Sequence, residues 1–158
     1  VPPSEDKETA RSYANGCDTF CVVRHPASRA VSEFMHGLGK CDVGGFAQWL
    51  RGSAAPGLDP YRRDCHLVPQ IRYVFSADHA QQYCQHILRY DNLEAEFNAL
   101  MQSFDIPLKL TPNKYLARPC HINFTQEIHG LIAAAYKDDF DEKAFHFDRD
   151  LMHAVFEF

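Results

Sequence analysis

The sequence predicts an α/β fold in which a mostly parallel sheet is flanked by helices. Two short apolar runs, residues 19–23 and 87–90, carry this prediction, because continuous runs of β-branched, aliphatic and aromatic residues are typical of buried strands. Each run is followed by a segment with helix-forming signals, and strands that alternate with helices form parallel sheets. We therefore expect the two runs to be neighbouring strands of one sheet, with the first buried on both faces.

Length and composition limit the size class and the partners of the chain. Its 158 residues, 46% of them hydrophobic, are enough for one core, so we expect a single domain. Asp and Glu number 21 against 16 Lys and Arg, an acidic balance that disfavours general nucleic-acid binding. No segment approaches the roughly 20 consecutive apolar residues of a membrane span, and the first residues lack a signal-peptide pattern. We expect neither a membrane span nor a nucleic-acid partner.

The first strand is followed by two predicted helices. Pro26 suits the first position of a helix, because its ring fixes φ and it lacks an N–H that would be unpaired there, so we expect a helix over residues 26–35. A short helix over residues 46–50 then leads into an irregular loop rich in Gly, Ala and Pro. After this loop, the sequence predicts a short strand at residues 73–75 and a helix that begins near Ala77.

The helix after the second strand has the clearest local signals. Asp91 is placed to cap it with Glu94 three residues later, and its apolar face carries Leu93, Phe97, Leu100, Met101 and Phe104. We expect this helix to pack on the sheet. Residues 105–119 contain three prolines and are expected to be extended, and Thr125 is placed to cap a closing helix.

Six cysteines and one glycosylation sequon bear on the compartment. An even number of cysteines permits disulfides in an oxidising compartment, but their irregular spacing gives no framework, so their pairing stays open. Zinc ligation by Cys17, Cys21, Cys65 and His66 is a weaker alternative, because the paired short spacings of zinc sites are absent. The sequon at residues 123–125 is compatible with a secretory lumen, but such tripeptides often arise by chance.

The most informative segment lies where the first strand meets its helix. Arg24 stands at the carboxyl end of the strand, the edge at which open α/β sheets bind ligands, and a helix N-terminus there adds N–H groups suited to a phosphate. Ser28 and Ser32 share a helix face, so a hydroxyl can face the anion that Arg24 binds. We therefore expect an anion site. The alternative is that Arg24 pairs with a carboxylate and Ser32 is a surface residue.

The same segment resembles a motif of sulfotransferases that use 3′-phosphoadenosine 5′-phosphosulfate (PAPS), particularly the carbohydrate sulfotransferase branch. The motif, R-x-P-x-x-R-x-x-S-x-aromatic, is formed here by Arg24, Pro26, Arg29, Ser32 and Phe34. Four further segments resemble the family in the same order: F-A-Q-W-L at 46–50, H-L-V-P-Q at 66–70, the strand, turn and helix at 87–97, and the closing helix with its Y-x-x-D-F ending within 132–147. The family-like core thus spans residues 18–147, between a helical lead-in at 1–17 and a tail at 148–158.

The resemblance implies a P-loop-NTPase-like sulfotransferase fold that binds PAPS along the carboxyl edge of its sheet. Such proteins transfer the sulfuryl group of PAPS to an acceptor hydroxyl and release 3′-phosphoadenosine 5′-phosphate (PAP). By this resemblance Arg24 and Ser32 would bind the 3′-phosphate of the nucleotide, and no metal would take part. The family also favours the lumen of the Golgi as the compartment.

The chain departs from the family pattern before its first strand. Family members carry there a strand and a glycine- or lysine-containing loop for the 5′-phosphosulfate, whereas this stretch offers only Lys7 and Gly16. The resemblance therefore implies a fold that is incomplete at its N-terminus and does not catalyse sulfation alone. The catalytic base would be lost with that region. His66 is a candidate substitute, although a histidine beside a Pro-Gln turn is more often a packing residue.

Two classes of function follow from this pattern. The chain is either the carboxyl-terminal part of a sulfotransferase that acts on a carbohydrate or similar hydroxyl, or a non-catalytic, sulfotransferase-like subunit of a larger assembly. A carbohydrate polyanion would be met by a basic groove, but the local basic points, Arg62, Arg63, Arg118 and residues 109–114, are scattered. The acceptor is therefore undetermined. A free-standing phosphate-binding domain is a third alternative.

Overall fold

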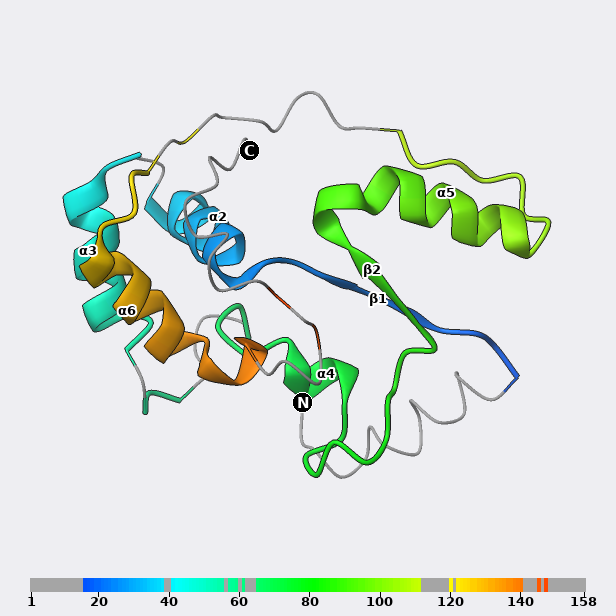
Figure 1. Cartoon of the computed structure of the whole chain (residues 1–158), viewed down its shortest axis with the longest axis horizontal. Helices are drawn as coiled ribbons and strands as arrows, with labels where there is room; N and C mark the ends of the chain where they lie inside the picture. The colour runs from blue at the N-terminus through cyan, green and yellow to red at the C-terminus, as the bar shows by residue number, and fades with distance from the viewer. Residues whose placement is uncertain are drawn as a thin grey trace.

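The computed structural model describes residues 16–38, 41–55, 57–59, 61, 65–111, 120, 122–140, 145 and 147. Within these residues the protein is an α/β structure with a small parallel sheet and several helices (Figure 1). The elements are β1 (Phe20–Val23), α2 (Pro26–Leu38), α3 (Val43–Gly52), α4 (Ile71–Val74), β2 (His86–Arg89), η1 (Tyr90–Asn92), α5 (Leu93–Ser103), α6 (Gln126–Ala135) and η2 (Lys137–Phe140). The tail at 148–158, nearly all of the lead-in at 1–17, and Arg62, Arg63 and Arg118 lie outside the described residues.

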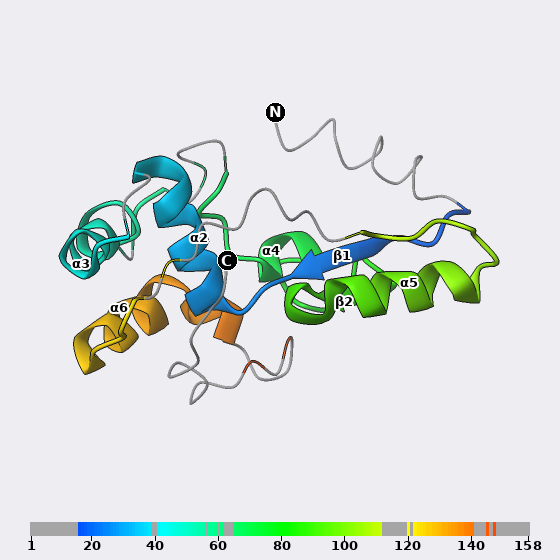
Figure 2. The same ribbon diagram turned by 90° about the horizontal axis from the view of Figure 1, so that it is seen from above.

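The two strands are neighbours and run parallel, as their apolar runs predicted. Phe20 pairs with His86 at one end of the register and Val23 pairs with Arg89 at the other. Figures 1 and 2 show α2, α3 and α6 gathered beyond the carboxyl end of β1, whereas α5 turns back along β2. Residues that directly follow both strands therefore meet at one edge of the sheet.

The expectation that β1 is buried on both faces is wrong. Phe20 is 44% exposed and Val22 is 36% exposed, whereas Val23 is buried. The sheet has two strands in the described part of the chain, and α5 contacts one of its faces through the ring pair of Phe20 and Phe97. An apolar run reports a preference for burial, but full burial needs elements on both faces.

Three predicted helices are confirmed, and two of them have side-chain caps. α2 begins at Pro26 as expected and runs one turn further than predicted. α3 extends beyond the predicted 46–50 because Asp42 accepts a hydrogen bond from the N–H of Gly45 (2.7 Å). The Thr125 hydroxyl caps α6 by accepting from the N–H of Ile128 (3.3 Å).

Two predictions between the strands are wrong. Residues 73–75 do not form a strand: most of this run lies in α4, where the N–H of Arg72 donates to the carbonyl of Pro69 (3.1 Å). A run of three apolar residues is too short for its periodicity to distinguish helix from strand. No helix begins near Ala77 among the described residues, because the Asp78 carboxylate accepts from the Ser76 hydroxyl and the Ala80 N–H, and such local bonds compete with a helix.

The cap predicted for α5 is also wrong in its residue. Asp91 lies inside the 3₁₀ turn η1, and Asn92 occupies the N-cap position of α5 without a side-chain hydrogen bond. The helix is instead tied to β2 by Glu96, whose carboxylate accepts from the N–H of Arg89 (2.5 Å). The prediction that α5 packs on the sheet is confirmed by the contact of Phe97 with Phe20.

The main core lies between α2, α3 and α6. Phe34 contacts Phe46 edge to face with ring centroids 5.3 Å apart, and Trp49 packs beside both rings. Ile128 and Ile132 bring the apolar stripe of α6 into this core. The core fixes the direction of α2, whose first residues follow directly on β1.

Two disulfides join segments that are distant in sequence. Cys21 of β1 is bonded to Cys84, just before β2, and Cys41 is bonded to Cys120. The alternative of a zinc site with Cys21 is therefore wrong, and the described residues hold no group of three or more His, Cys, Asp or Glu side chains suited to a metal ion. Cys17 and Cys65 are exposed thiols. None of the described helices is long and apolar enough to span a membrane.

Candidate anion-binding site

Arg24 occupies the short link between β1 and α2. The strand ends at Val23 and the helix begins at Pro26, so the Arg24 side chain leaves the backbone at the carboxyl edge of the sheet. His25, the other residue of the link, is buried and its Nδ1 accepts from the N–H of Ala27 (3.2 Å). The link is therefore held tightly against the first turn of α2.

The Arg24 guanidinium lies between a hydroxyl and an aromatic ring. Its Nε donates to Ser28 Oγ at 2.6 Å, and Ser28 is buried on the first turn of α2. Its central carbon lies 4.1 Å from the centroid of the Tyr90 ring, which directly follows β2. A guanidinium stacked on an aromatic face is favourable electrostatically and restricts the plane of the fork. The two contacts fix the orientation of the group.

The electrostatics of Arg24 favour an anionic ligand. Burial lowers the pKa of Arg24 from its ordinary value, while Tyr90 and the nearby carboxylate of Asp91 oppose this shift. An arginine keeps its charge despite such a shift, because its ordinary pKa lies far above neutral pH. A cation that has lost part of its hydration gains from an anion that replaces the lost water.

Ser32, the second residue expected at the site, lies one turn beyond Ser28 on α2 and is half-buried. Residues four apart on a helix are neighbours on its surface, so both hydroxyls belong to one face. The described contact with Arg24 is made by Ser28 rather than by Ser32. The charge of the Asp91 carboxylate acts on Arg24, and Ser28 and Tyr90 are among the residues that hold its side chain.

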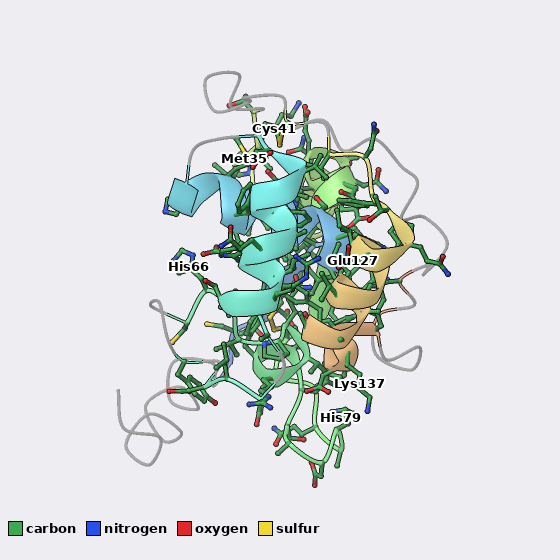
Figure 3. The ribbon with its side chains drawn as sticks, turned by 90° about the vertical axis from the view of Figure 1, so that its left-hand side faces the viewer. Met35, Cys41, His66, His79, Glu127 and Lys137 are labelled. Atoms are coloured by element: carbon green, nitrogen blue, oxygen red, sulfur yellow. A yellow bond between two sulfur atoms is a disulfide. The ribbon has the colours of Figure 1, made fainter. Side chains whose placement is uncertain are left out.

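His66 is the first residue of the H-L-V-P-Q segment and lies at the edge of the molecule in Figure 3. Its Nδ1 is 2.8 Å from a carboxylate oxygen of Glu33 on α2, its ring stacks on His36, and its side chain is 44% exposed. A neutral imidazole that donates from Nδ1 to a carboxylate presents its Nε2 as a proton acceptor. The pair has the form of an oriented general base.

Two residues of the site were not among the predicted site residues. The sequence predicts Tyr90 as the last residue of a strand, and its position beside Arg24 follows only from the register of the two strands. Gln70 is the last residue of the H-L-V-P-Q segment, and the sequence alone predicts no role for it in the site. In the structure its side-chain amide is hydrogen-bonded to the backbone of Arg24. The sequence carried a signal for Gln70 in this motif but none for its contact with Arg24.

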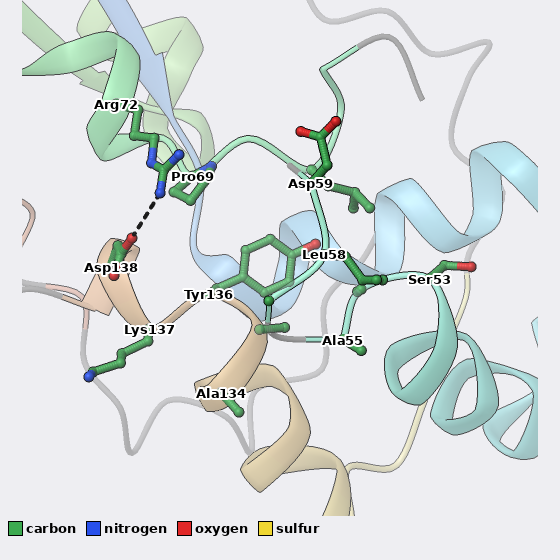
Figure 4. Close-up of a pocket in the computed structure, with 14 residues that line it drawn as sticks. Ser53, Ala55, Leu58, Asp59, Pro69, Arg72, Ala134, Tyr136, Lys137 and Asp138 are labelled. Carbon is green, nitrogen blue, oxygen red and sulfur yellow. Dashed lines mark ion pairs between the residues drawn. The ribbon is translucent and has the colours of Figure 1, made fainter. Parts of the chain in front are cut away.

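A separate cavity of about 300 Å³ opens between the end of α3, the loop at 53–59 and the end of α6 (Figure 4). Small apolar side chains line much of it, and the ion pair of Arg72 with Asp138 (3.9 Å) lies at its border. The hydroxyl of Tyr136 in its lining is buried without a hydrogen-bond partner in the described part of the chain. This cavity is lined by neither Arg24 nor Ser28.

The described site thus contains an oriented arginine and two serine hydroxyls on one helix face. The pair of His66 with Glu33 lies further along α2, and the structure does not bring it into contact with Arg24. Comparisons of the chain with models of protein families, with curated proteins and with solved structures return no match.

Proposed function

We propose that this chain is a nucleotide-binding domain of the PAPS-dependent sulfotransferase type, with Arg24 and Ser32 as ligands of the 3′-phosphate. The observation that carries the proposal is the position of Arg24: it follows a parallel strand, donates to Ser28 on the first turn of the next helix and stacks on Tyr90. Ligands of open α/β sheets bind at this edge, and the planar fork of an arginine matches a phosphate group.

In an assembly that supplies the missing 5′-phosphosulfate loop, the proposed reaction transfers a sulfuryl group to an acceptor hydroxyl of a carbohydrate or a similar compound. As the hydroxyl oxygen bonds to sulfur, the bond from sulfur to the 5′-phosphate oxygen breaks and PAP leaves with the electron pair. His66 is the candidate base, because its Nδ1 faces Glu33 and its Nε2 can accept the hydroxyl proton. Such a transfer depends mainly on positioning and charge neutralisation.

The two disulfides support an oxidising compartment for this protein, in keeping with the secretory lumen that the resemblance favours. Disulfides persist in secreted and lumenal proteins and are rare where glutathione keeps thiols reduced. Four of the six cysteines are paired, and both bonds link segments more than 60 residues apart in sequence.

Calorimetric titration of the chain with PAP tests the proposal. We expect binding, and we expect Arg24→Ala to weaken it about 10- to 100-fold, since hydrogen bonds to charged groups contribute about 1.5–3 kcal/mol. Arg72→Ala is the matched control, because Arg72 is an exposed arginine paired with Asp138 on another surface. Equal weakening by both substitutions, or no effect of Arg24→Ala, would contradict the proposed site.

A non-catalytic subunit of a larger assembly is the second candidate function. It is favoured by apolar side chains that remain exposed beside α5: Phe104 at 43%, Ile106 at 45% and Leu108 at 56%. Neighbouring apolar side chains exposed in this way are typical of interaction surfaces. A chain that does not bind PAP but belongs to an assembly with a mass in solution well above its own 18.1 kDa would support this candidate over the first.

A further inference from the structure

The side chain of Gln70 is paired with the backbone of Arg24 on both sides of that residue. The N–H of Arg24 donates to Gln70 Oε1, and Gln70 Nε2 donates to the carbonyl of Arg24, both at 2.8 Å. Gln70 is only 2% exposed and lies 46 residues along the chain from its partner. A primary amide that donates and accepts in this way reproduces the pair of bonds that a neighbouring strand would supply.

Gln70 is itself held by a buried carboxylate. Asp139, on η2, is 0% exposed and accepts from the N–H of Ile71 at 3.0 Å. Its other oxygen lies 3.5 Å from Gln70 Nε2 and 3.4 Å from Nη1 of Arg29. A buried carboxylate is stabilised only by such donors. Gln70 and Ile71 therefore supply hydrogen bonds that Asp139 needs, and Asp139 in turn holds this part of the chain in position.

Arg29 fastens the same loop from the side of α2. Its Nη2 donates to the carbonyls of His66 (2.9 Å) and Val68 (2.7 Å), while its Nη1 faces Asp139. The loop at residues 66–70 is thus attached to both α2 and η2. These contacts limit the movement of the loop that carries Gln70.

The backbone conformation of a residue sets the direction of its side chain. Arg24 lies in a link of two residues between a strand and a helix, and its guanidinium must meet both Ser28 and Tyr90. Hydrogen bonds weaken steeply when their angle departs from linear, so a small displacement of such a group weakens its bonds to an anion. A fixed Arg24 backbone is therefore a requirement for the site rather than a detail of packing.

We infer that Gln70 is a positioning residue for Arg24, and that Asp139 and Arg29 hold Gln70 in place for that purpose. The inference rests on the proposed function, in which Arg24 binds the 3′-phosphate of the nucleotide. The side-chain amide of Gln70 thus controls the affinity of the sheet edge for an anion by holding the Arg24 backbone, without touching the anion itself.

The experiment compares PAP binding by wild type, Gln70→Met and Gln70→Glu at pH 7.5 and pH 5.5. Met removes both hydrogen bonds at similar volume, and we expect it to weaken PAP binding about tenfold or more. A Glu carboxylate keeps the acceptor for the Arg24 N–H but faces the Arg24 carbonyl and Asp139 without a proton to donate. The introduced carboxyl group regains a donor when it is protonated. Asp139, whose pKa burial raises to about 6, loses its charge over the same range, so we expect the affinity of Gln70→Glu, relative to wild type at the same pH, to recover at pH 5.5.

Two controls separate positioning from loss of structure. Gln48→Met changes an exposed glutamine on α3 and is expected to leave PAP affinity unchanged. Amide exchange measured by NMR reports the Arg24 N–H directly: it should be protected in wild type and Gln70→Glu and should lose protection in Gln70→Met. Circular dichroism identifies any variant that fails to fold. The recovery of PAP affinity by Gln70→Glu at pH 5.5 then tests the positioning role within one folded protein.

The outcomes distinguish this inference from the proposed function. If wild type binds PAP and folded Gln70→Met binds within about twofold of it, or if Gln70→Glu shows no relative recovery at pH 5.5, the positioning role is overturned and the nucleotide site stands. If wild type does not bind PAP, the proposed function fails first and the positioning role fails with it.

Discussion

Arg24 and Tyr90 meet at the carboxyl ends of two paired strands, with the guanidinium carbon 4.1 Å from the centroid of the ring. Val23 and Arg89 are the last pair in the register, so Arg24 and Tyr90 are the next residues along each strand. The stacking is thus a direct consequence of parallel pairing. It brings residues that are 66 positions apart in sequence into one candidate site.

The first prediction concerns this stacking. Tyr90→Ala should weaken PAP binding about two- to fivefold, since a partly exposed cation–π contact contributes about 0.5–1 kcal/mol. Tyr90→Phe keeps the aromatic face and should bind like wild type. Calorimetric titration of both variants measures the effect, and equal weakening by Phe and Ala would show that the ring face is not what orients Arg24.

The second prediction concerns the pH dependence of stability. Burial raises the pKa of Asp139 to about 6 from an ordinary value of 3.8, although hydrogen bonds from Ile71 and Gln70 and the charge of Arg29 oppose the shift. Tyr73 and Tyr136, on neighbouring elements, titrate far above this range because burial raises the pKa of both. Of these three side chains, Asp139 is therefore the one that changes charge between about pH 4 and pH 6.

The sign follows from which state binds the proton. Between pH 3.8 and about 6 the folded protein holds a proton on Asp139 that the unfolded chain has lost. The stabilisation of the folded state by this proton is therefore fully present below pH 3.8 and is lost as the pH rises through about 6. A shift of about two pKa units corresponds to about 3 kcal/mol. Urea unfolding at pH 4 and pH 6.5 should show wild type losing about 2 kcal/mol of stability relative to Asp139→Asn, since part of the effect lies below pH 4. A constant difference between the two proteins would contradict the burial of this carboxyl group.

The third prediction concerns the disulfides. Peptide mapping without reduction should recover Cys21 linked to Cys84 and Cys41 linked to Cys120, with Cys17 open to alkylation. Replacing Cys41 and Cys120 together with serine should lower the free energy of unfolding by about 2–5 kcal/mol, measured in urea. The link between Cys41 and Cys120 joins two segments that lead into core helices. An unchanged urea midpoint would indicate that the bond is not formed in the native protein.

The fourth prediction concerns the cap of α3. Asp42→Ala removes the acceptor for the Gly45 N–H and should destabilise the protein by about 1 kcal/mol. Asp42→Asn keeps a capping oxygen and should restore most of the loss. Chemical denaturation distinguishes these variants, and an Asn variant as unstable as the Ala variant would argue against a capping role.

Local signals in the sequence were sufficient for much of the fold. Pro26 and Thr125 predicted helix starts because their effects on the backbone are local, and the two apolar runs predicted strands that the structure pairs in parallel. Residues 73–75 were misassigned because three apolar residues carry no period. The larger fold of which this sheet would be a part remains a proposal from the resemblance.

The candidate site was predictable only in part. Arg24 could be placed because its position follows from a strand and a helix that are adjacent in sequence. Gln70 and Asp139 could not be assigned roles, because their contacts join segments 46 and 69 residues apart and depend on the packing of a loop. Local rules say nothing about which backbone a side-chain amide will meet.

The central claim is that Arg24 reads the 3′-phosphate of a nucleotide, and one comparison tests it most directly. PAP and adenosine 5′-phosphate differ by that phosphate, so calorimetry with both ligands on wild type and Arg24→Ala isolates its contribution. We expect wild type to prefer PAP by about tenfold or more and Arg24→Ala to lose this preference. Equal affinity of wild type for the two nucleotides, or a preference that survives in Arg24→Ala, would contradict it.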